Sequence, residues 1–240
     1  MEWFKTWFAS PYYHVLYKDR DDREAEFFIE NLLKKLNPKK NSKFLDLACG
    51  AGRHSIFLNS KGYSTVGVDL SEPSIELAKK SEKENLDFYV HDMRNLFRTN
   101  HFNYIVNLFT SFGYFEEERD NIKMLNACYK GLTKNGALVI DFMNTTKVIN
   151  NLVSEEIKVV DNITFNIERA FDGRFIRKRI RFQIQEKSFD FEEKVQQIEI
   201  EKMKYFLSAA GFKDLTFYGN YKMEAFKEND SDRLIVIAKK

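Results

Sequence analysis

Short apolar runs and amphipathic stretches alternate along residues 43–144. The apolar runs have the length of buried strands, whereas the amphipathic stretches repeat apolar residues at helical spacing. The pattern therefore predicts strands at residues 43–48, 64–70, 86–92, 102–109 and 134–144. It predicts helices at residues 21–36, 53–62, 71–84 and 116–132. Ser71 is the expected N-cap of the third helix, with Pro73 in its first turn.

Strands that alternate with helices of this length require a mostly parallel sheet covered on both faces. Residues 157–200 differ, because apolar and charged residues alternate on both sides of Asp172 and Gly173, which is a hairpin signal. A helix at 199–212 and strands at 213–221 and 232–240 follow. We therefore expect an α/β fold with a doubly wound, seven-stranded, mostly parallel sheet. Residues 1–240 form a single domain in this prediction, and residues 155–200 form an antiparallel β insertion after the fifth strand, as a lid or a dimer surface.

The charge of the chain is nearly balanced. Its 240 residues include 38 basic and 36 acidic side chains, which are interspersed along the sequence. This distribution argues against a dedicated nucleic-acid surface and favours a small-molecule partner. The two cysteines give no disulfide pattern, which predicts a cytoplasmic protein, and no apolar run is long enough for a signal peptide or a membrane span. A monomer and a homodimer are both compatible with these features.

The segment "FLDLACGAGRH" at residues 44–54 places two glycines directly after the first predicted strand. In a doubly wound sheet this turn borders the ligand crevice. Gly50 and Gly52 can adopt positive φ and let ligand atoms approach the backbone, while the next helix offers free N–H groups. A tight turn without a ligand would use the same residues. Ser55 stands where the dinucleotide fingerprint has its third glycine, so the sequence disfavours a nicotinamide cofactor.

An aspartate lies at or near the end of each of the first three strands, at Asp46, Asp69 and Asp92. Asp69 can accept hydrogen bonds from both hydroxyls of a ribose. Asp92 can accept one from an adenine amino group, while Met93 packs on the ring. Asp46 suits a cationic ligand better than a pyrophosphate, because opposite charges attract strongly where water is scarce. Each acid alone is compatible with an ordinary solvated strand end, but together they outline a pocket.

The stretches "FLDLACGAGRHSIFL", "VGVDLS", "HDMRNL" and "NLFTSFGYF" resemble the motifs of class I S-adenosylmethionine-dependent methyltransferases. The resemblance covers nearly the whole chain, and the two closing strands resemble the reversed terminal hairpin of that family. It implies a Rossmann-like methyltransferase fold, S-adenosyl-L-methionine as the cofactor, and methyl transfer to N, O or C of a small molecule. Ala48 replaces the glycine of the usual family signature and keeps a small residue there.

The resemblance also implies which residues bind the cofactor; no metal ligand is assigned. These residues are Asp46, Ala48, Gly50 and Gly52 near the methionine part, Asp69 and Leu70 on the ribose, Asp92 and Met93 on the adenine, and Asn107 and Leu108 along the wall of the site. Arg53 is a candidate ligand for a carboxylate of the cofactor or substrate. His54 is expected to be structural.

The segment "YYHVLY" at residues 12–17 resembles the Tyr-Asp-x-x-Tyr arm that folds over the cofactor in small-molecule methyltransferases. His14 stands where that arm has its aspartate. Tyr13 and Tyr17 are then expected over the methionine end, although packing on the core explains an aromatic arm equally well. Methyl transfer from a sulfonium requires alignment rather than a covalent nucleophile. If the acceptor needs a base, His14 is the candidate, with Tyr13, Tyr17 or Tyr114 as orienting partners.

Two other functions stay open. A nucleic-acid methyltransferase, for example one acting on RNA, shares the cofactor domain. However, the adenine-amino enzymes carry Asn/Asp-Pro-Pro-aromatic where this chain has "NLFT", and the pyrimidine enzymes need a catalytic cysteine, which neither Cys49 nor Cys128 is placed to provide. A binding protein that senses S-adenosylmethionine would show affinity without turnover. The basic run at residues 174–181 fits either an anionic partner or one solvated face of a strand.

Overall fold

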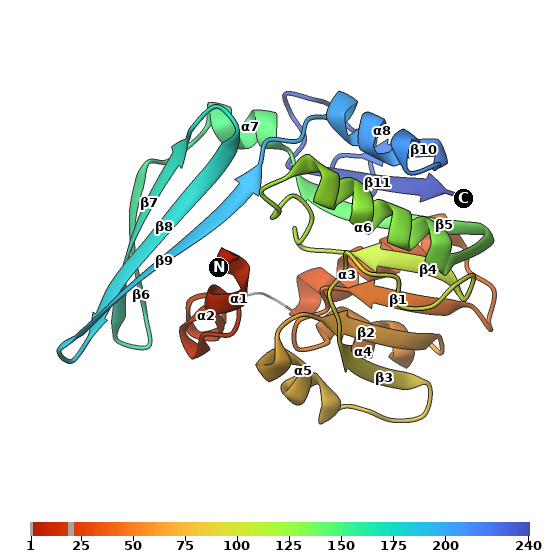
Figure 1. The fold of residues 1–240 in the computed structure, drawn as a ribbon, viewed down its shortest axis with the longest axis horizontal. Coiled ribbons are helices and arrows are strands. Elements are labelled where there is room, and N and C mark those ends of the chain that lie inside the picture. Colours follow the sequence, from red (N-terminus) through yellow and green to blue (C-terminus); the bar gives the residue numbers. More distant parts are fainter. Residues whose placement is uncertain (1, 19–21) are drawn as a thin grey trace.

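The computed structural model of the chain describes residues 2–18 and 22–240. Its strands form two separate sheets (Figure 1). The strands of the larger sheet are β1 (Lys43–Leu47), β2 (Ser64–Asp69), β3 (Leu86–Val90), β4 (Phe102–Asn107), β5 (Leu132–Met143), β10 (Lys213–Tyr218) and β11 (Arg233–Lys239). The strands of the smaller sheet are β6 (Glu155–Val160), β7 (Ile163–Phe171), β8 (Phe175–Ile184) and β9 (Lys187–Gln196).

The larger sheet has the strand order β10-β11-β5-β4-β1-β2-β3. Neighbouring strands from β5 through β4, β1 and β2 to β3 are parallel, whereas β11 is antiparallel to both β5 and β10. The predicted seven-stranded, mostly parallel sheet with a reversed closing hairpin is therefore confirmed. Because the strand order reverses direction beside β1, the carboxyl ends of β1 and β4 border the crevice where such sheets bind ligands.

The helices cover the sheet and contribute an arm at the N-terminus (Figure 1). Their bounds are α1 (Trp3–Trp7), α2 (Pro11–Leu16), α3 (Asp22–Leu36), α4 (Arg53–Ser60), α5 (Glu72–Lys79), α6 (Glu118–Gly131), α7 (Thr145–Asn150) and α8 (Ile200–Ala209). The predicted cap of α5 is present, since the Ser71 side chain accepts a hydrogen bond from the Ser74 N–H. Within the described residues, no helix combines the length and the apolar character that crossing a membrane requires.

The fifth strand differs slightly from its prediction. The strand was predicted at residues 134–144, but β5 already begins at Leu132, and Asn135 and Gly136, a pair typical of turns, lie inside it. Asn135 has a φ of 63°, and the register against β4 shifts between Phe102 and Tyr104. The two residues therefore form an irregularity within the strand rather than a turn before it.

The insertion folds as an antiparallel sheet in the order β6-β7-β8-β9. Its predicted hairpin turn is present between β7 and β8, where Asp172 Oδ1 accepts hydrogen bonds from the N–H groups of Arg174 and Phe175. Cross-strand carboxylates pair with the basic run, for example Arg179 with Asp190 at 2.5 Å. The basic run is thus part of a mixed-charge, exposed surface.

The arm formed by residues 2–18 packs against the insertion. Ser10 caps α2 by accepting a hydrogen bond from the Tyr12 N–H, and Pro11 occupies the first turn. Trp7 and Leu16 are almost fully buried in an apolar cluster whose other core members come from β6, β7 and β8. In Figure 1 the arm lies between the insertion and the larger sheet. The helical form of the arm was not predicted from the sequence.

Candidate active site

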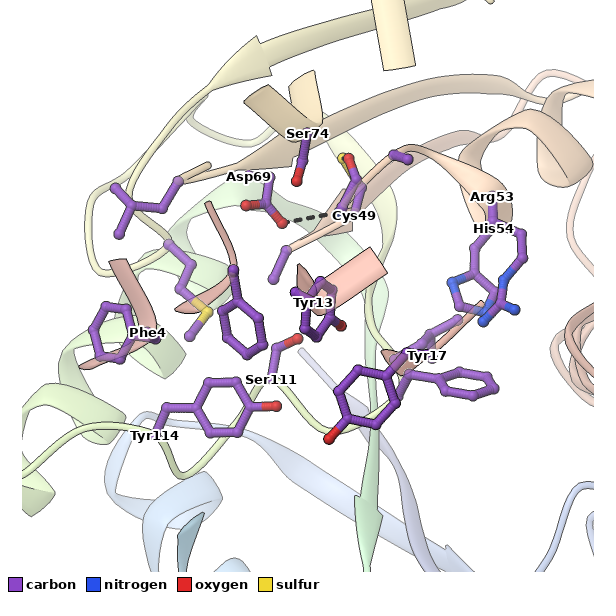
Figure 2. A pocket seen from close by; sticks show the side chains of 18 of the residues that line it. Phe4, Tyr13, Tyr17, Cys49, Arg53, His54, Asp69, Ser74, Ser111 and Tyr114 are labelled. Atoms are coloured by element: carbon purple, nitrogen blue, oxygen red, sulfur yellow. Dashed lines mark hydrogen bonds between the residues drawn. The ribbon is translucent and has the colours of Figure 1, made fainter. Parts of the chain in front are cut away.

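A cavity of about 440 Å³ lies beyond the carboxyl ends of β1, β2, β3 and β4 and is covered by the arm. Figure 2 shows Asp69 and Ser74 on one side and Tyr114 and Tyr17 on the opposite side, with Tyr13 between them. Most residues predicted for the site line this cavity: Tyr13, His14, Tyr17, Ala48, Gly50, Arg53, Asp69, Leu70, Asp92, Met93, Leu108 and Tyr114. The structure places Asp46, Gly52 and Asn107 outside the cavity wall.

The glycine loop after β1 is held in an unusual backbone conformation. Ala48, Gly50 and Gly52 have φ angles of 58°, 56° and 86°, in the region that favours glycine. A Cβ on Gly50 would meet nothing within 4 Å, so the backbone there stays open to the cavity. A Cβ on Gly52 would lie 2.6 Å from Cε1 of Phe88. Glycine is therefore needed at position 52 for packing against β3, and the predicted cofactor contact of Gly52 stays a prediction.

Asp69 lies on the cavity wall with both carboxylate oxygens bonded to backbone. Its Oδ2 accepts a hydrogen bond from the Gly50 N–H and its Oδ1 accepts one from the Ser71 N–H, each at 2.8 Å. Burial raises the pKa of Asp69, although these hydrogen bonds oppose the shift. An ionised carboxylate has about four lone-pair sites, so about two remain for ligand hydroxyls. Asp69 thus fixes the glycine loop and can still accept hydrogen bonds from the hydroxyls of a ribose.

Asp92 is paired with Arg94, a residue of the "HDMRNL" motif for which the sequence predicted no role. The Arg94 Nη2 donates to Asp92 Oδ2 at 2.6 Å, and Arg94 Nε and backbone N–H both donate to Oδ1. The same guanidinium binds Glu2 of the arm at 2.7 Å. Burial disfavours the ionised form of Asp92, but the hydrogen bonds and charge of Arg94 outweigh it and lower its pKa. Little acceptor capacity is left for an adenine amino group, so this role stays a prediction.

Asp46 and Asn107 lie behind the cavity wall. Asp46 is 1% exposed and accepts a hydrogen bond from Ser55 Oγ at 2.6 Å. Burial raises the pKa of Asp46 to about 7, although the Ser55 bond opposes the shift. Asn107 is fully buried, and its side-chain N–H donates to the Leu47 carbonyl at 2.8 Å, which ties β4 to β1. An attraction of Asp46 for a cationic ligand would therefore act from behind the loop rather than by contact.

The arm brings three predicted residues to the cavity. The Tyr13 ring centroid lies 5.3 Å from that of His14 and 5.1 Å from that of Tyr17. The Tyr17 hydroxyl donates to Glu193 Oε1 at 2.5 Å, and Trp7 Nε1 donates to the same oxygen at 2.7 Å. Because Glu193 belongs to β9, the insertion holds the arm that covers the cavity. No residue of the insertion is among the described residues that line the cavity.

The loop after β4 supplies another wall. Leu108, Phe109 and Ser111 line the cavity, and the guanidinium carbon of Arg53 lies 4.7 Å from the Phe109 ring centroid. The ring of His54, which was expected to be structural, lies 5.3 Å from Phe109 and also lines the cavity. Arg53 therefore lines the cavity and is stacked on an aromatic ring, whereas its role as a carboxylate ligand stays a prediction.

Several other lining residues were missed from the sequence: Phe4, Phe8, Lys18, Cys49, Ala51, Ser74, His91, Phe109 and Phe115. A signal existed for two of them, because Phe4 and Phe8 are four residues apart in the aromatic segment that starts the chain. Had that segment been interpreted as helical, both rings would have been placed on one face. Ser74 lies in the first turn of α5, and the others lie in turns and loops between elements, whose path periodicity does not describe.

Comparison with known proteins agrees with this geometry. Residues 44–136 match the family model described as a methyltransferase domain. The chain is 28% identical over 232 residues to a glycine/sarcosine N-methyltransferase of Aphanothece halophytica, covering 92% of this chain and 83% of that protein.

Solved structures share the fold over almost the whole chain. An S-adenosylmethionine-dependent methyltransferase from Clostridium acetobutylicum has a TM-score of 0.78 at 21% identity and covers 97% of both chains. An amino pentose methyltransferase from Micromonospora echinaspora, with S-adenosylmethionine bound, has a TM-score of 0.74 at 16% identity and covers 96% of this chain and 97% of that one. The chain therefore shares the fold of S-adenosylmethionine-dependent methyltransferases, and its residues 44–136 are similar to a methyltransferase domain.

Proposed function

We propose that this methyltransferase binds S-adenosylmethionine in the cavity beneath the arm and methylates a small molecule, with an amine nitrogen as the favoured acceptor atom. The observation that carries the proposal is the enclosure of the cavity by the arm, since Tyr13, His14 and Tyr17 cover the strand ends. A cover of this kind admits a small acceptor more readily than a polymer. The similarity to a glycine/sarcosine N-methyltransferase supports nitrogen as the acceptor.

The residues on the strand-end side fit the cofactor. The open backbone at Gly50 allows close approach, and Asp69 keeps acceptor capacity for the ribose hydroxyls. Met93 provides apolar contact for a flat base, and Leu70 lines the cavity next to Asp69. When bound, the cofactor supplies a methyl group already activated by a sulfonium. The chain therefore needs to bind, orient and exclude water rather than provide a nucleophile.

The residues on the arm side act on the acceptor. Tyr13 and Tyr114 line the cavity with hydroxyl groups that can orient it, and Ser111 adds a third. Alignment of this kind is worth roughly 7 to 11 kcal/mol. His14 receives the proton of a protonated amine, which frees the nitrogen lone pair for the methyl group, and a base of this kind contributes about 10²- to 10⁴-fold.

A nucleic-acid substrate is less well supported. The basic side chains of β8 are paired, as in the contacts of Arg177 with Asp172 and Glu192. The pyrimidine route also lacks a reactive thiol, because burial raises the pKa of both Cys49 and Cys128. The oligomeric state, monomer or homodimer, stays a prediction. The cytoplasmic location also stays a prediction.

The test is methyl transfer from S-adenosylmethionine with a tritiated methyl group to a panel of glycine, sarcosine, amino sugars, hydroxyquinones and bulk RNA. We expect incorporation into one of the small amines and none into RNA. Incorporation into RNA alone would favour the nucleic-acid enzyme. Binding of the cofactor without transfer to any compound, measured by calorimetry on the same sample, would favour the sensor.

A further inference from the structure

A buried ion pair lies behind the loop that follows β4, outside the cavity wall. Asp141 of β5 is fully buried, and Arg233 at the start of β11 donates from Nε to its Oδ1 at 2.8 Å. The Tyr221 hydroxyl donates to the other oxygen, Oδ2, at 3.2 Å. Buried ion pairs are costly to desolvate, so their retention calls for a reason other than stability.

The loop in front of this ion pair has a strained backbone. Phe109 and Thr110 both have a φ of 61°, in the left-handed region that side chains with a Cβ rarely adopt. Two consecutive residues of this kind persist only where their surroundings impose the conformation.

Asp141 and Arg233 provide that constraint. The Phe109 N–H donates to Asp141 Oδ2 at 3.1 Å, and the Thr110 N–H donates to the main-chain oxygen of Asp141 at 3.2 Å. Arg233 Nη2 donates to Thr110 Oγ1 at 3.0 Å. Every one of these bonds joins the ion pair to the two strained residues.

The strained conformation determines what the loop presents to the cavity. Phe109 and Ser111 line it, and the Phe109 ring is stacked on Tyr221 at 6.0 Å. Arg53 lies on the same Phe109 ring. A change in the φ angles of Phe109 and Thr110 would therefore move the aromatic wall and its cation together.

We propose that Asp141 and Arg233 are positioning residues that hold Phe109 and Thr110 in the left-handed conformation and thereby shape the acceptor side of the cavity. This inference rests on the proposed function, because the loop affects catalysis only if the cavity is the active site. The two residues act through the loop and do not touch the reacting atoms.

The variant Asp141→Asn separates the hydrogen bond to Arg233 from the hydrogen bonds to Phe109 and Tyr221. The carboxylate accepts from Arg233 with one oxygen and from Phe109 and Tyr221 with the other. Asparagine has one acceptor oxygen, so if that oxygen stays with Arg233, the amide NH2 faces the Phe109 N–H, a donor against a donor.

The first measurement is amide hydrogen exchange with S-adenosylhomocysteine bound. We expect exchange at Phe109 and Thr110 to be at least about tenfold faster in Asp141→Asn than in the wild type, with β2 unchanged as the internal control. Unchanged protection of the two amides would overturn the proposal, whatever the activity. If Asp141→Asn does not fold, Arg233→Lys replaces it, because lysine keeps the charge but cannot span Asp141 and Thr110 at once.

The second measurement uses the acceptor found by the panel. We expect Asp141→Asn to lower kcat by at least about tenfold, since small displacements of positioning groups have effects of this size, and to change the S-adenosylhomocysteine Kd by less than about threefold. Adding Thr110→Gly should recover part of the loss, because glycine adopts positive φ without strain. Adding Thr110→Ala instead should not recover the loss, because alanine also lacks the hydroxyl but keeps the Cβ that makes positive φ costly.

Equal effects of Thr110→Gly and Thr110→Ala, or a wild-type kcat in Asp141→Asn, would show that the pair is merely structural. A wild-type enzyme that methylates no compound would instead contradict the proposed function, and hydrogen exchange would still decide the role of the pair.

Discussion

At the scale of single residues, Asp69 connects the glycine loop to the proposed ribose site. Its carboxylate accepts from the N–H groups of Gly50 and Ser71 while facing the cavity. We expect Asp69→Ala to weaken S-adenosylmethionine binding by more than about tenfold, because hydrogen bonds to a charged group contribute about 1.5–3 kcal/mol each. Isothermal titration calorimetry measures the loss. The control is Asp87→Ala, which removes an exposed carboxylate of β3, and unchanged affinity in Asp69→Ala would remove the ribose assignment.

Ala48 is the residue at which this chain departs from the usual glycine of the family signature. Its φ of 58° places a Cβ in the left-handed region, which costs about 1–2 kcal/mol. We expect Ala48→Gly to relieve this strain and to raise the free energy of unfolding by up to about 1 kcal/mol. The gain is smaller than the full strain because glycine also gains entropy in the unfolded chain, which offsets part of it.

Urea unfolding of the ligand-free protein measures this change. Ala51→Gly is the matched control, because Ala51 belongs to the same loop but is not among the residues with positive φ. Ala51→Gly should leave stability equal or lower. A loss of stability in Ala48→Gly would mean that the methyl group of Ala48 packs favourably enough to outweigh the strain.

At the scale of elements, the insertion acts on the cavity through the arm. Trp7 of α1 and Tyr17, just after α2, both donate to Glu193 of β9. The connection between the insertion and the cavity is therefore indirect, with the arm in between. The insertion therefore acts by fixing the arm and not by touching a ligand in the cavity.

The variant Glu193→Ala tests this link. It leaves the donors of Trp7 and Tyr17 without their acceptor, so we expect the arm to dock less stably and S-adenosylhomocysteine to bind about threefold to tenfold more weakly. Calorimetry measures the affinity, and tryptophan fluorescence reports exposure of Trp7, which is fully buried in the wild type.

Glu192→Ala provides the comparison from the same strand. Glu192 pairs with Arg177 on the exposed surface, and exposed ion pairs contribute about 1 kcal/mol or less. Neither affinity nor fluorescence should change in Glu192→Ala. Equal effects of the two variants would show that Glu193 has no specific role in docking the arm.

At the scale of the whole molecule, the strand and helix order was predictable because the apolar periodicity is strong and the glycine loop, Asp69 and Asp92 fall at or directly after the ends of strands. The different roles of the two glycines were not predictable: the backbone of Gly50 is open to the cavity, whereas Gly52 is packed against Phe88. This difference depends on the Phe88 ring, which a parallel crossover brings beside Gly52. Such contacts between distant segments leave no local pattern in a sequence.

Burial and pairing of charges were equally hidden from sequence reasoning. Asp46 was expected to contact a ligand, but the fold places it behind the loop with Ser55 as its partner. Asp92 lines the cavity, but Arg94, two residues later, turns back onto it and occupies much of its acceptor capacity. In both cases the residue type was informative, whereas its partner depended on how the chain turns after the strand.

The buried Asp46 also predicts how the stability of the ligand-free molecule depends on pH. Its pKa is about 7 in the folded protein, whereas an unperturbed aspartate, as in the unfolded chain, has a pKa of 3.8. The folded state therefore binds more protons than the unfolded state between these two values, so the free energy of unfolding falls as pH rises from about 4 to about 7.

Asp46→Asn removes this ionisation and keeps an acceptor for the Ser55 hydroxyl. We expect the free energy of unfolding of Asp46→Asn, relative to the wild type, to rise between pH of about 5 and about 8 by on the order of a few kcal/mol. Asp69, whose pKa is also raised by burial, should leave a slope of the same sign in the variant. Urea unfolding across this pH range measures the difference. Parallel curves for the variant and the wild type would contradict the buried, protonated state of Asp46, whereas Asp87→Asn, which changes an exposed carboxylate, should give parallel curves.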